Sequence, residues 1–387
     1  MIPAARIQAA IELLDEIAAG KPVEQALTGW ARRSRFAGSG DRAVVRDHVF
    51  EALRRKRSFA ALGGAETGRG LMLGALRHSG TDPETVFTGA RHCPEPLSDA
   101  ERAGGRAPVN AAERFDMPDW LWPAFSASLG AQAEEGAIAS QHRAPVWLRA
   151  NLARTTREGA VRVLSEDDIK CDLHPSVDTA IRVIEGERKV AASRAYREGL
   201  VELQDASSQA VISALPLRSG MRVLDYCAGG GGKSLALAAT KGVQVCASDI
   251  DPRRMRDLPE RAARAGVSIK LLDPGALAQA GPFDLVLVDA PCSGSGAWRR
   301  SPAGKWALTQ ERLDALTGIQ AEILDRASRL VSAGGVLAYA TCSVLSAENA
   351  RQVQEFIARH SAWRCVFDRV WPVNDLGDGF FTAHLTR

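Results

Sequence analysis

The chain has 387 residues, of which 45% are hydrophobic and 25% are charged, and its formal net charge is +3. This length and composition predict a globular protein with two or three domains and sizeable cores, and the lack of a long apolar run excludes membrane spans. The seven cysteines have no C-x-x-C spacing, which excludes a disulfide framework and a zinc site.

The first part of the chain is predicted to be all-helical. The N-terminal residues lack the apolar core of a signal peptide, so we expect a cytoplasmic protein. From Ala4 to about Glu101, apolar residues recur at helical spacing. The first such series is Ile7, Ile11, Leu14 and Ile17.

Basic residues gather in this helical segment, although the net charge of the chain is only +3. The densest clusters are Arg32-Arg33-Ser34-Arg35 and Arg54-Arg55-Lys56-Arg57. Clusters of this kind are either solvated helix faces or contacts to nucleic-acid phosphates. The pattern leaves both open, and we take phosphate contact as the hypothesis.

A linker is predicted around residues 104–123, where Trp120 and Trp122 are expected to dock onto the next domain. The pattern then changes to short β-rich runs separated by helical or loop stretches. These runs cover residues 146–151 and 180–184. They predict a small α+β module.

From Met221 to Arg387, apolar strands alternate with helical stretches, which predicts a doubly wound parallel sheet. The predicted strands are 222–225, 243–247, 269–272, 284–288 and 336–339. Ligands of such sheets bind at the carboxyl ends of the strands. We therefore expect the acidic residues at these ends to line one crevice, namely Asp225, Asp249, Asp273 and Asp289.

The segment 223–235 joins the first of these strands to a helix through four consecutive glycines, which lets backbone N–H groups approach a ligand. A P-loop is excluded because Cys227 occupies the position of its first glycine. A dinucleotide-binding fingerprint is excluded because Ser234 occupies the position of its third glycine. An S-adenosylmethionine loop fits, since Asp249 follows Gly229 by 20 residues, the usual reach to a ribose. A glycine-rich helix entry without a ligand is the remaining alternative.

Cys292 and Cys342 each come just after a predicted buried strand. A buried cysteine is usually a small core residue, but these two face the crevice that also holds the glycine loop. A thiolate there could add to carbon 6 of a pyrimidine and make carbon 5 nucleophilic enough to accept a methyl group. The reaction also needs an acid near ring N3 and a base for the carbon 5 proton. On these grounds either cysteine could be the nucleophile.

Three segments carry a resemblance to a known family. They are Asp289-Ala-Pro-Cys-Ser-Gly-Ser-Gly296, Trp298-Arg-Arg-Ser-Pro302 with Lys305-Trp306, and Tyr339-Ala-Thr-Cys-Ser-Val-Leu-Ser-Ala-Glu-Asn349. Together they resemble the Sun-type (RsmB/Nop family) RNA (cytosine-5) methyltransferases, and the resemblance covers residues 145–387 well. It implies that Cys342 is the nucleophile and that Cys292 assists product release.

The resemblance also implies the contacts of the cofactor, S-adenosyl-L-methionine. Asp249 would hold the ribose, Asp273 would lie near the adenine, and Asp289 would lie between cofactor and cytosine. The residues around the methionine end would be Cys227, Ala228, Gly229, Gly230, Gly231, Gly232 and Lys233.

Three domains are implied by the same resemblance. They are a helical, NusB-like RNA-binding domain at 1–125, a small α+β RNA-binding module at 140–210, and a Rossmann-like S-adenosylmethionine-dependent methyltransferase domain at 211–387. The implied activity is methyl transfer to carbon 5 of a cytosine in RNA. Small-subunit ribosomal RNA is favoured over transfer RNA, and we expect a monomer that uses neither a metal ion nor a membrane.

The sequence departs from the family pattern at two places. The segment 228–233 lacks the family's proline, and four glycines lose more chain entropy on ordering, which predicts weaker cofactor binding. Asp273-Pro274 replaces the usual Asp-Ala or Asp-Gly, so the adenine contact is less defined. The alternatives are a catalytically idle RNA-binding factor, disfavoured because both Cys292 and Cys342 are present, and methyl transfer to protein or DNA.

Overall fold

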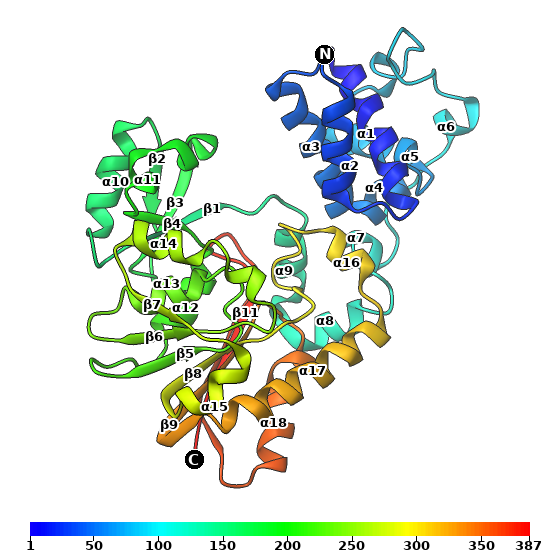
Figure 1. Cartoon of the computed structure of the whole chain (residues 1–387). Helices are drawn as coiled ribbons and strands as arrows, with labels where there is room; N and C mark the ends of the chain where they lie inside the picture. The colour runs from blue at the N-terminus through cyan, green and yellow to red at the C-terminus, as the bar shows by residue number, and fades with distance from the viewer. The chain divides into compact units, whose positions relative to one another are not determined.

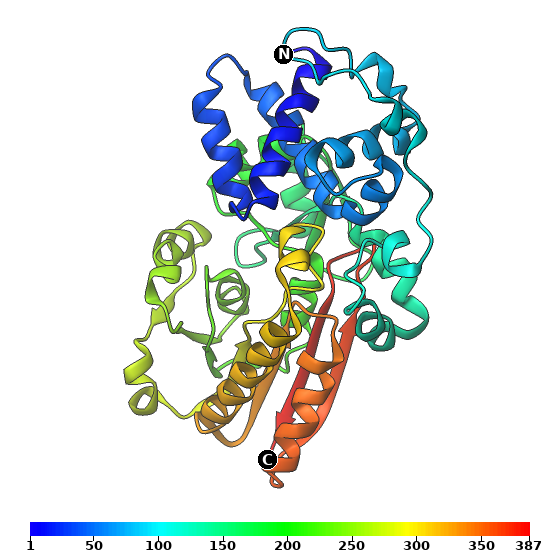
Figure 2. The same cartoon turned by 90° about the vertical axis from the view of Figure 1, so that its right-hand side faces the viewer.

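The computed structural model describes all 387 residues, Met1–Arg387, and the chain forms two compact units (Figures 1 and 2). The helical unit contains Met1–Arg143 together with Trp298–Ala307, and the sheet unit contains Ala144–Ala297 and Leu308–Arg387. None of the helices has both the length and the apolar character needed to span a bilayer. The three-part division of the sequence stays a prediction, and it did not anticipate the placement of residues 298–307.

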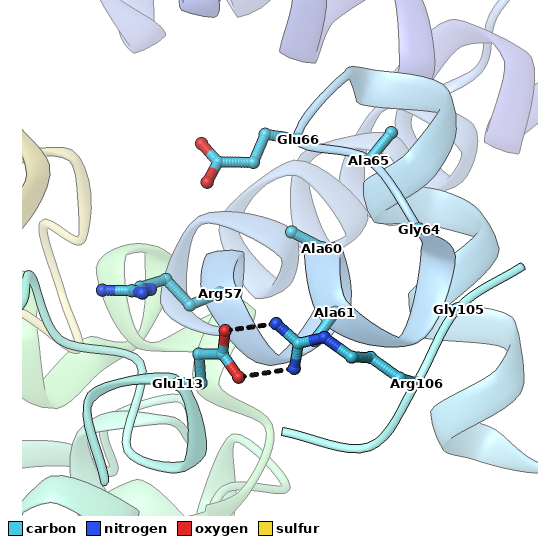
Figure 3. A pocket seen from close by; sticks show the side chains of 9 residues that line it. All are labelled: Arg57, Ala60, Ala61, Gly64, Ala65, Glu66, Gly105, Arg106 and Glu113. Carbon is cyan, nitrogen blue, oxygen red and sulfur yellow. Dashed lines mark hydrogen bonds and ion pairs between the residues drawn. The ribbon is translucent and has the colours of Figure 1, made fainter. Parts of the chain in front are cut away.

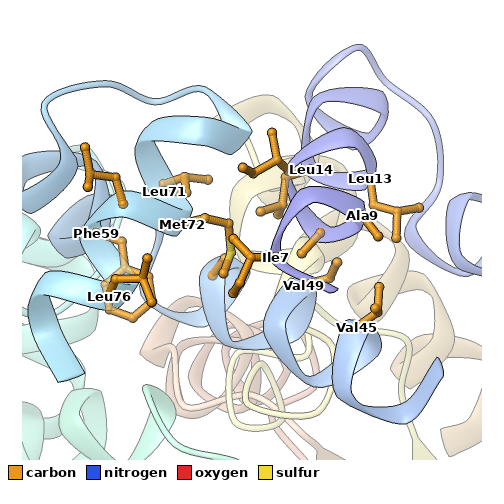
Figure 4. Packing of buried hydrophobic residues seen from close by; sticks show 14 of the residues in the cluster. Ile7, Ala9, Leu13, Leu14, Val45, Val49, Phe59, Leu71, Met72 and Leu76 are labelled. Carbon is orange, nitrogen blue, oxygen red and sulfur yellow. The ribbon is translucent and has the colours of Figure 1, made fainter. Parts of the chain in front are cut away.

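The helical unit has one apolar core, built from the helical series that the sequence predicts. Ile7, Val49 and Met72, from three different helices, point toward one another in it (Figure 4). Two of the helices can approach closely because Gly63 has no side chain. A Cβ at this position would lie 1.8 Å from the carbonyl oxygen of Gly70. The helices are α1 (Pro3–Ala18), α2 (Val23–Arg33), α3 (Ser39–Arg54), α4 (Lys56–Gly63), α5 (Gly68–Ser79), α6 (Asp99–Ala103), α7 (Ala111–Arg114), α8 (Trp122–Leu129), α9 (Ala133–Ser140) and α16 (Ala303–Ala307).

Residues 298–307 pack in the helical unit, although their sequence neighbours on both sides belong to the sheet unit. They lie on the C-terminal end of α3, where helix carbonyl groups lack helical partners. Trp306 Nε1 donates to the carbonyl of Leu53 (2.6 Å), and Lys305 Nζ donates to the carbonyl of Arg54 (3.2 Å). Burial lowers the pKa of Lys305 to about 8. These side chains therefore cap α3.

The two basic clusters of the helical unit differ in exposure. Arg32, Arg33 and Arg35 are exposed, as contacts to phosphates require. Arg54 and Arg55 are each only 9% exposed, and Arg54 donates to a backbone carbonyl inside the unit. The hypothesis that the second cluster binds phosphates is therefore wrong for these two residues, because their guanidinium groups serve packing.

The tryptophans of the predicted linker lie in the helical unit. The ring of Trp122 stacks on that of Phe115 at a centroid distance of 4.7 Å and on that of Phe125 at 6.1 Å. Trp120 is 37% exposed. The ring contacts of Trp122 thus fasten α8 within its own unit, whereas the sequence suggested docking onto the next domain.

The smaller of the two sheets has the strand order β2-β3-β1-β4, with antiparallel pairing throughout. Its elements follow a β-α-β-β-α-β sequence, which is the ferredoxin-like arrangement, and its helices pack their buried residues against the strands. The predicted α+β module is present, with two more strands than the sequence indicated. The elements are β1 (Val146–Ala150), α10 (Arg157–Glu166), β2 (Lys170–Leu173), β3 (Ala180–Glu185), α11 (Arg194–Arg197) and β4 (Val201–Leu203).

The larger sheet has seven strands in the order β10-β11-β9-β8-β5-β6-β7. The five from β9 to β7 are parallel, which confirms the predicted parallel sheet, whereas β11 and β10 add an antiparallel edge that the sequence did not reveal. The strands are β5 (Arg222–Asp225), β6 (Gln244–Ala247), β7 (Ile269–Leu271), β8 (Phe283–Asp289), β9 (Val331–Thr341), β10 (Arg364–Trp371) and β11 (Phe380–Thr386).

Helices cover both faces of this sheet. Alternate strand residues enter two different cores, as the two-residue period of a strand requires: Leu285 packs with α12 and α13, and Val286 packs with α17 and α18. The helices α17 and α18 lie side by side over their face (Figures 1 and 2). The helices are α12 (Ala206–Ser213), α13 (Gly232–Ala238), α14 (Leu258–Ala265), α15 (Leu277–Ala280), α17 (Gln310–Ser328) and α18 (Ala350–Arg359).

Candidate active site

A pocket of about 590 Å³ lies at the carboxyl ends of the parallel strands. Its walls include the segments that follow β5, β6, β8 and β9, and its volume is typical of small-molecule sites. We call it the strand-end pocket. Of the residues predicted from the sequence, it brings together Cys227, Ala228, Gly229, Gly230, Gly232, Lys233, Asp249, Asp289, Cys292 and Cys342.

Two predicted cofactor residues do not line this pocket. A Cβ on Gly231 would lie 2.3 Å from a methyl carbon of Leu258, so this glycine faces helix α14. Asp273 is exposed, whereas Pro274 and Leu277 just beyond it line the pocket. Asp273 was expected to contact the adenine, but at this place the pocket wall is formed by the apolar side chains of Pro274 and Leu277.

The glycine loop is held in place by Asp249. This side chain is 1% exposed, and its carboxylate accepts hydrogen bonds from the backbone N–H groups of Gly229 (2.8 Å) and Asp251 (3.0 Å). The guanidinium of Arg254 lies 3.2 Å from it. Gly229 has a φ of 53° and Gly231 a φ of 79°, a region that favours glycine. The ribose role implied for Asp249 would therefore add to a structural role.

Asp225, at the end of β5, was expected to line the crevice but is not among the residues that line the strand-end pocket. Its side chain is fully buried; Oδ2 accepts a hydrogen bond from Ser234 Oγ (2.6 Å), and Oδ1 has no partner. Burial raises the pKa of Asp225 to about 7. A buried carboxyl with one free oxygen and a pKa near neutrality can hold a proton.

Lys233 and Asp289 form an ion pair in the strand-end pocket. Lys233 Nζ donates to Asp289 Oδ2 at 2.8 Å and lies 4.8 Å from the ring centre of Phe380. Burial opposes the charge on Lys233, but Asp289 outweighs it, through its own charge and hydrogen bond, and raises the pKa of the ammonium. The pocket therefore holds a fixed cation beside a carboxylate that can accept hydrogen bonds.

The two cysteines are neighbours although 50 residues separate them in the sequence. Their Sγ atoms lie 3.4 Å apart. The hydrogen bond with Cys342, followed by burial, raises the pKa of Cys292 well above its ordinary value. Cys342 is among the groups whose charge raises the pKa of Lys233. Either sulfur could donate this hydrogen bond, and the raised pKa of Cys292 favours its thiol form.

Family models match two segments of the chain. A family model described as 16S rRNA methyltransferase RsmB/F matches residues 212–386, and a ferredoxin-like domain model of RsmF/B-like methyltransferases matches 117–190. The ribosomal RNA small subunit methyltransferase B of Serratia proteamaculans is 33% identical over 72% of this chain and 68% of its own length. That of Salmonella arizonae is 36% identical over 71% and 67%.

The chain belongs to the RsmB/F family. It is therefore a methyltransferase of a family that acts on ribosomal RNA and uses S-adenosylmethionine, as the resemblance implied. The fold is shared with two crystal structures. PH0851 is 24% identical with a TM-score of 0.78, covering 100% of this chain and 99% of the other. A methyltransferase homologue from Pyrococcus horikoshii is 22% identical with a TM-score of 0.62, covering 71% and 96%.

Two residues in or next to the pocket of this RsmB/F member were missed from the sequence. Ile250 lines the strand-end pocket and is 82% exposed, and its position directly after Asp249 is the signal that could have found it. Arg149 of β1 donates to the carbonyl of Gly232 at 2.8 Å and to Gln204 at 2.5 Å, which ties the glycine loop to the smaller sheet. No local pattern reveals Arg149, because both partners are distant in sequence.

A second cavity, of about 440 Å³, lies in the helical unit (Figure 3). Three of its charged residues are paired: both terminal nitrogens of Arg106 donate to the carboxylate of Glu113 at 2.7 Å, and Arg57 pairs with Asp119, outside the cavity lining, at 2.7 Å. The Arg106 hydrogen bond is the main reason that the pKa of Glu113 falls to about 2. None of the cysteines lines this cavity, whereas two of them face each other in the strand-end pocket, which favours the strand-end pocket as the active site.

Proposed function

We propose that this protein transfers a methyl group from S-adenosyl-L-methionine to carbon 5 of a cytosine in small-subunit ribosomal RNA, through a covalent bond between Cys342 and carbon 6. The observation that carries the proposal is the cysteine pair, whose Sγ atoms lie 3.4 Å apart in the same pocket as the glycine loop. Methylation of an exocyclic nitrogen needs no thiol, so the pair favours carbon 5. The names of the relatives, small subunit methyltransferases, support the choice of RNA.

The residues of the strand-end pocket suit the cofactor. The glycine loop offers backbone N–H groups for its methionine end, and Asp249 offers carboxylate oxygen for the ribose hydroxyls. Ile250, Pro274 and Leu277 form an apolar wall against which the adenine ring is proposed to pack. When bound, S-adenosylmethionine supplies an electrophilic methyl group.

Cys342 is the proposed nucleophile. Its sulfur forms a bond to carbon 6, and the electron pair of the 5,6 double bond becomes available at carbon 5, which then takes the methyl group. Lys233 and Asp289, paired at 2.8 Å, lie in the same pocket. Asp289 is proposed to accept a hydrogen bond from a protonated ring N3, because a proton there neutralises the negative charge that the thiolate brings to the ring as Cys342 attacks.

Cys292 is proposed to act in release. The carbon 5 proton must leave as the bond between carbon 6 and the Cys342 sulfur breaks, so that the double bond reforms and the thiolate is regenerated. The raised pKa of Cys292 keeps it a thiol while Cys342 attacks, so that it does not compete for carbon 6. Once Cys292 has lost its own proton to solvent, its sulfur is a base strong enough to take the carbon 5 proton. This division of labour agrees with the roles that the resemblance implied.

The two cysteine variants distinguish these roles. Cys342→Ala is expected to abolish methylation and form no adduct. Cys292→Ala is expected to attack and methylate but to release slowly, so that a protein–RNA adduct accumulates. Each variant is incubated with S-adenosylmethionine and unmodified small-subunit RNA and run on a denaturing gel.

A slow-migrating band for Cys292→Ala and none for Cys342→Ala supports the proposal. The opposite pattern would exchange the roles, and full methylation by both variants would rule out covalent catalysis. The matched control is Cys246→Ala, a half-buried cysteine outside the pocket, which should behave as wild type. Bisulfite sequencing of RNA from a deletion strain identifies the cytidine and separates ribosomal from transfer RNA.

A further inference from the structure

Glu348 lies at the end of the short turn Ser346–Glu348, six residues after Cys342, and is fully buried. Its carboxylate accepts hydrogen bonds from two neighbouring loops. Oε1 accepts from the backbone N–H of Ser293 (2.8 Å), and Oε2 accepts from the hydroxyls of Ser293 and Ser343. Ser293 directly follows Cys292, and Ser343 directly follows Cys342.

Other contacts fix the carboxylate itself. Gln320 of α17 donates through Nε2 to Glu348 Oε1 (3.0 Å) and also to the carbonyl of Pro291 (2.9 Å). Tyr339 of β9 donates its hydroxyl to the backbone carbonyl of Glu348 (2.7 Å). A buried carboxylate costs free energy unless hydrogen bonds compensate it, and here donors from a helix, a strand and both cysteine loops do so. A single acceptor therefore ties the two loops together.

We propose that Glu348 is a positioning residue that holds Cys292 and Cys342 at their mutual distance and keeps Cys292 in its thiol form. The inference deepens the proposed function and rests on it, because the need for one thiolate and one thiol follows from covalent catalysis at cytosine. Glu348 does not face the cytosine itself, since it is absent from the lining of the strand-end pocket.

The charge of Glu348 bears on one cysteine in particular. Cys342, burial and Glu348 all act to raise the pKa of Cys292. The other titratable groups around the pair are Tyr339, whose own pKa is raised well above its ordinary value by burial first and then by Cys292 and Glu348, and the Lys233–Asp289 pair. Glu348 thus combines a geometric and an electrostatic effect, and the two can be separated.

Glu348→Gln removes the charge and keeps the shape. A glutamine oxygen can still accept from Ser293 N–H and Gln320, and its NH₂ can donate to the serine hydroxyls, since hydroxyls also accept. The paired variant Ser293→Ala with Ser343→Ala keeps the charge and removes the two hydroxyl hydrogen bonds to Glu348, together with the bonds that the N–H groups of Ser295 and Leu345 donate to these hydroxyls. The first variant tests the electrostatic effect and the second tests the geometric one, and either remains informative if the other fails to fold.

The first measurement needs neither RNA nor S-adenosylmethionine. The rate of iodoacetamide labelling of Cys292 is followed against pH, with mass spectrometry to resolve it from the other cysteines. In Glu348→Gln the midpoint is expected to fall by about one pH unit, because a nearby like charge is removed. In the double serine variant it should stay within a few tenths of a unit of wild type. An unchanged midpoint in Glu348→Gln would overturn the electrostatic half of the inference.

The second measurement uses methylation of small-subunit RNA. The double serine variant is expected to lose about 100-fold in kcat with an unchanged KM for S-adenosylmethionine, since misplacement by about 1 Å costs that much. Wild-type kcat in this variant would overturn the geometric half. If the RNA is not methylated at carbon 5 even by wild type, the proposed function fails, whereas the labelling result still decides whether Glu348 controls Cys292.

Discussion

Replacing Asp249 by alanine should weaken S-adenosylmethionine binding. In the structure its carboxylate accepts from the N–H groups of Gly229 (2.8 Å) and Asp251 (3.0 Å). Alanine also removes the acceptor proposed for the ribose hydroxyls, and a polar group left unpaired in the complex costs about 1–3 kcal/mol. That range corresponds to about a 5- to 150-fold higher Kd, since about 1.4 kcal/mol is a factor of ten.

Isothermal titration calorimetry with S-adenosylmethionine measures this loss, and thermal unfolding without the cofactor separates its causes. If Asp249 mainly holds the loop, Asp249→Ala lowers the Tm of the free protein as well as the affinity. If it contacts only the ribose, the Tm stays at the wild-type value. Asp249→Asn keeps one acceptor oxygen and should give an intermediate affinity.

Asp251→Ala is the matched control. The Asp251 carboxylate pairs with Arg253 at 2.8 Å, and the Arg253 side chain is 89% exposed, so this pair contributes little to stability. Asp251→Ala should bind S-adenosylmethionine like wild type. An unchanged affinity in Asp249→Ala together with a loss in Asp251→Ala would refute the reasoning and move the ribose contact to Asp251.

Two further predictions concern charge. Replacing the exposed residues Arg32, Arg33 and Arg35 by glutamate should weaken RNA binding and reduce its salt dependence, because fewer phosphates are neutralised. If a filter-binding titration shows unaltered affinity and salt slope, the cluster is a solvated helix face. Arg54→Glu, at a buried position, should instead lower the Tm. Because burial raises the folded-state pKa of Asp225 from 3.8 to about 7, the folded state holds the extra proton, and stability should decrease as pH rises from about 4 to about 7. Asp225→Asn should flatten this part of a denaturant-unfolding pH profile, and an equally steep profile in that variant would contradict the assignment.

The parallel strands could be predicted because each is a short apolar run that ends at a turn or an acid. The predicted limits of β5 match the structure, and those of β8 differ by one residue at each end. The antiparallel edge was missed for a physical reason. β10 is largely exposed along its length, so it has neither an apolar run nor a clean alternation, and its pairing with β11 is fixed by contacts that no local pattern carries.

Site residues were predicted correctly where they lie directly at the end of a strand. The prediction failed where the position of a residue depends on the path of a loop. Asp249, Asp289 and Cys342 lie at such ends and line the strand-end pocket. Asp273 also follows a strand, but the turn beyond β7 presents Pro274 to the pocket instead. The run of four glycines does not predict that Gly231 faces α14, because the orientation of Gly231 depends on its contact with Leu258, which is distant in sequence.

The segment 298–307 illustrates a limit of motif reading. It resembles a family motif that follows the Pro-Cys pair, and proximity in sequence suggests a part in catalysis. In the structure its Trp298, Arg299 and Lys305 are 2%, 2% and 1% exposed within the helical unit. A buried lysine needs hydrogen-bond acceptors. The C-terminal carbonyl groups of a helix carry partial negative charge, and the carbonyl of Arg54 accepts from Lys305. The helical unit is therefore completed by residues from the middle of the methyltransferase sequence.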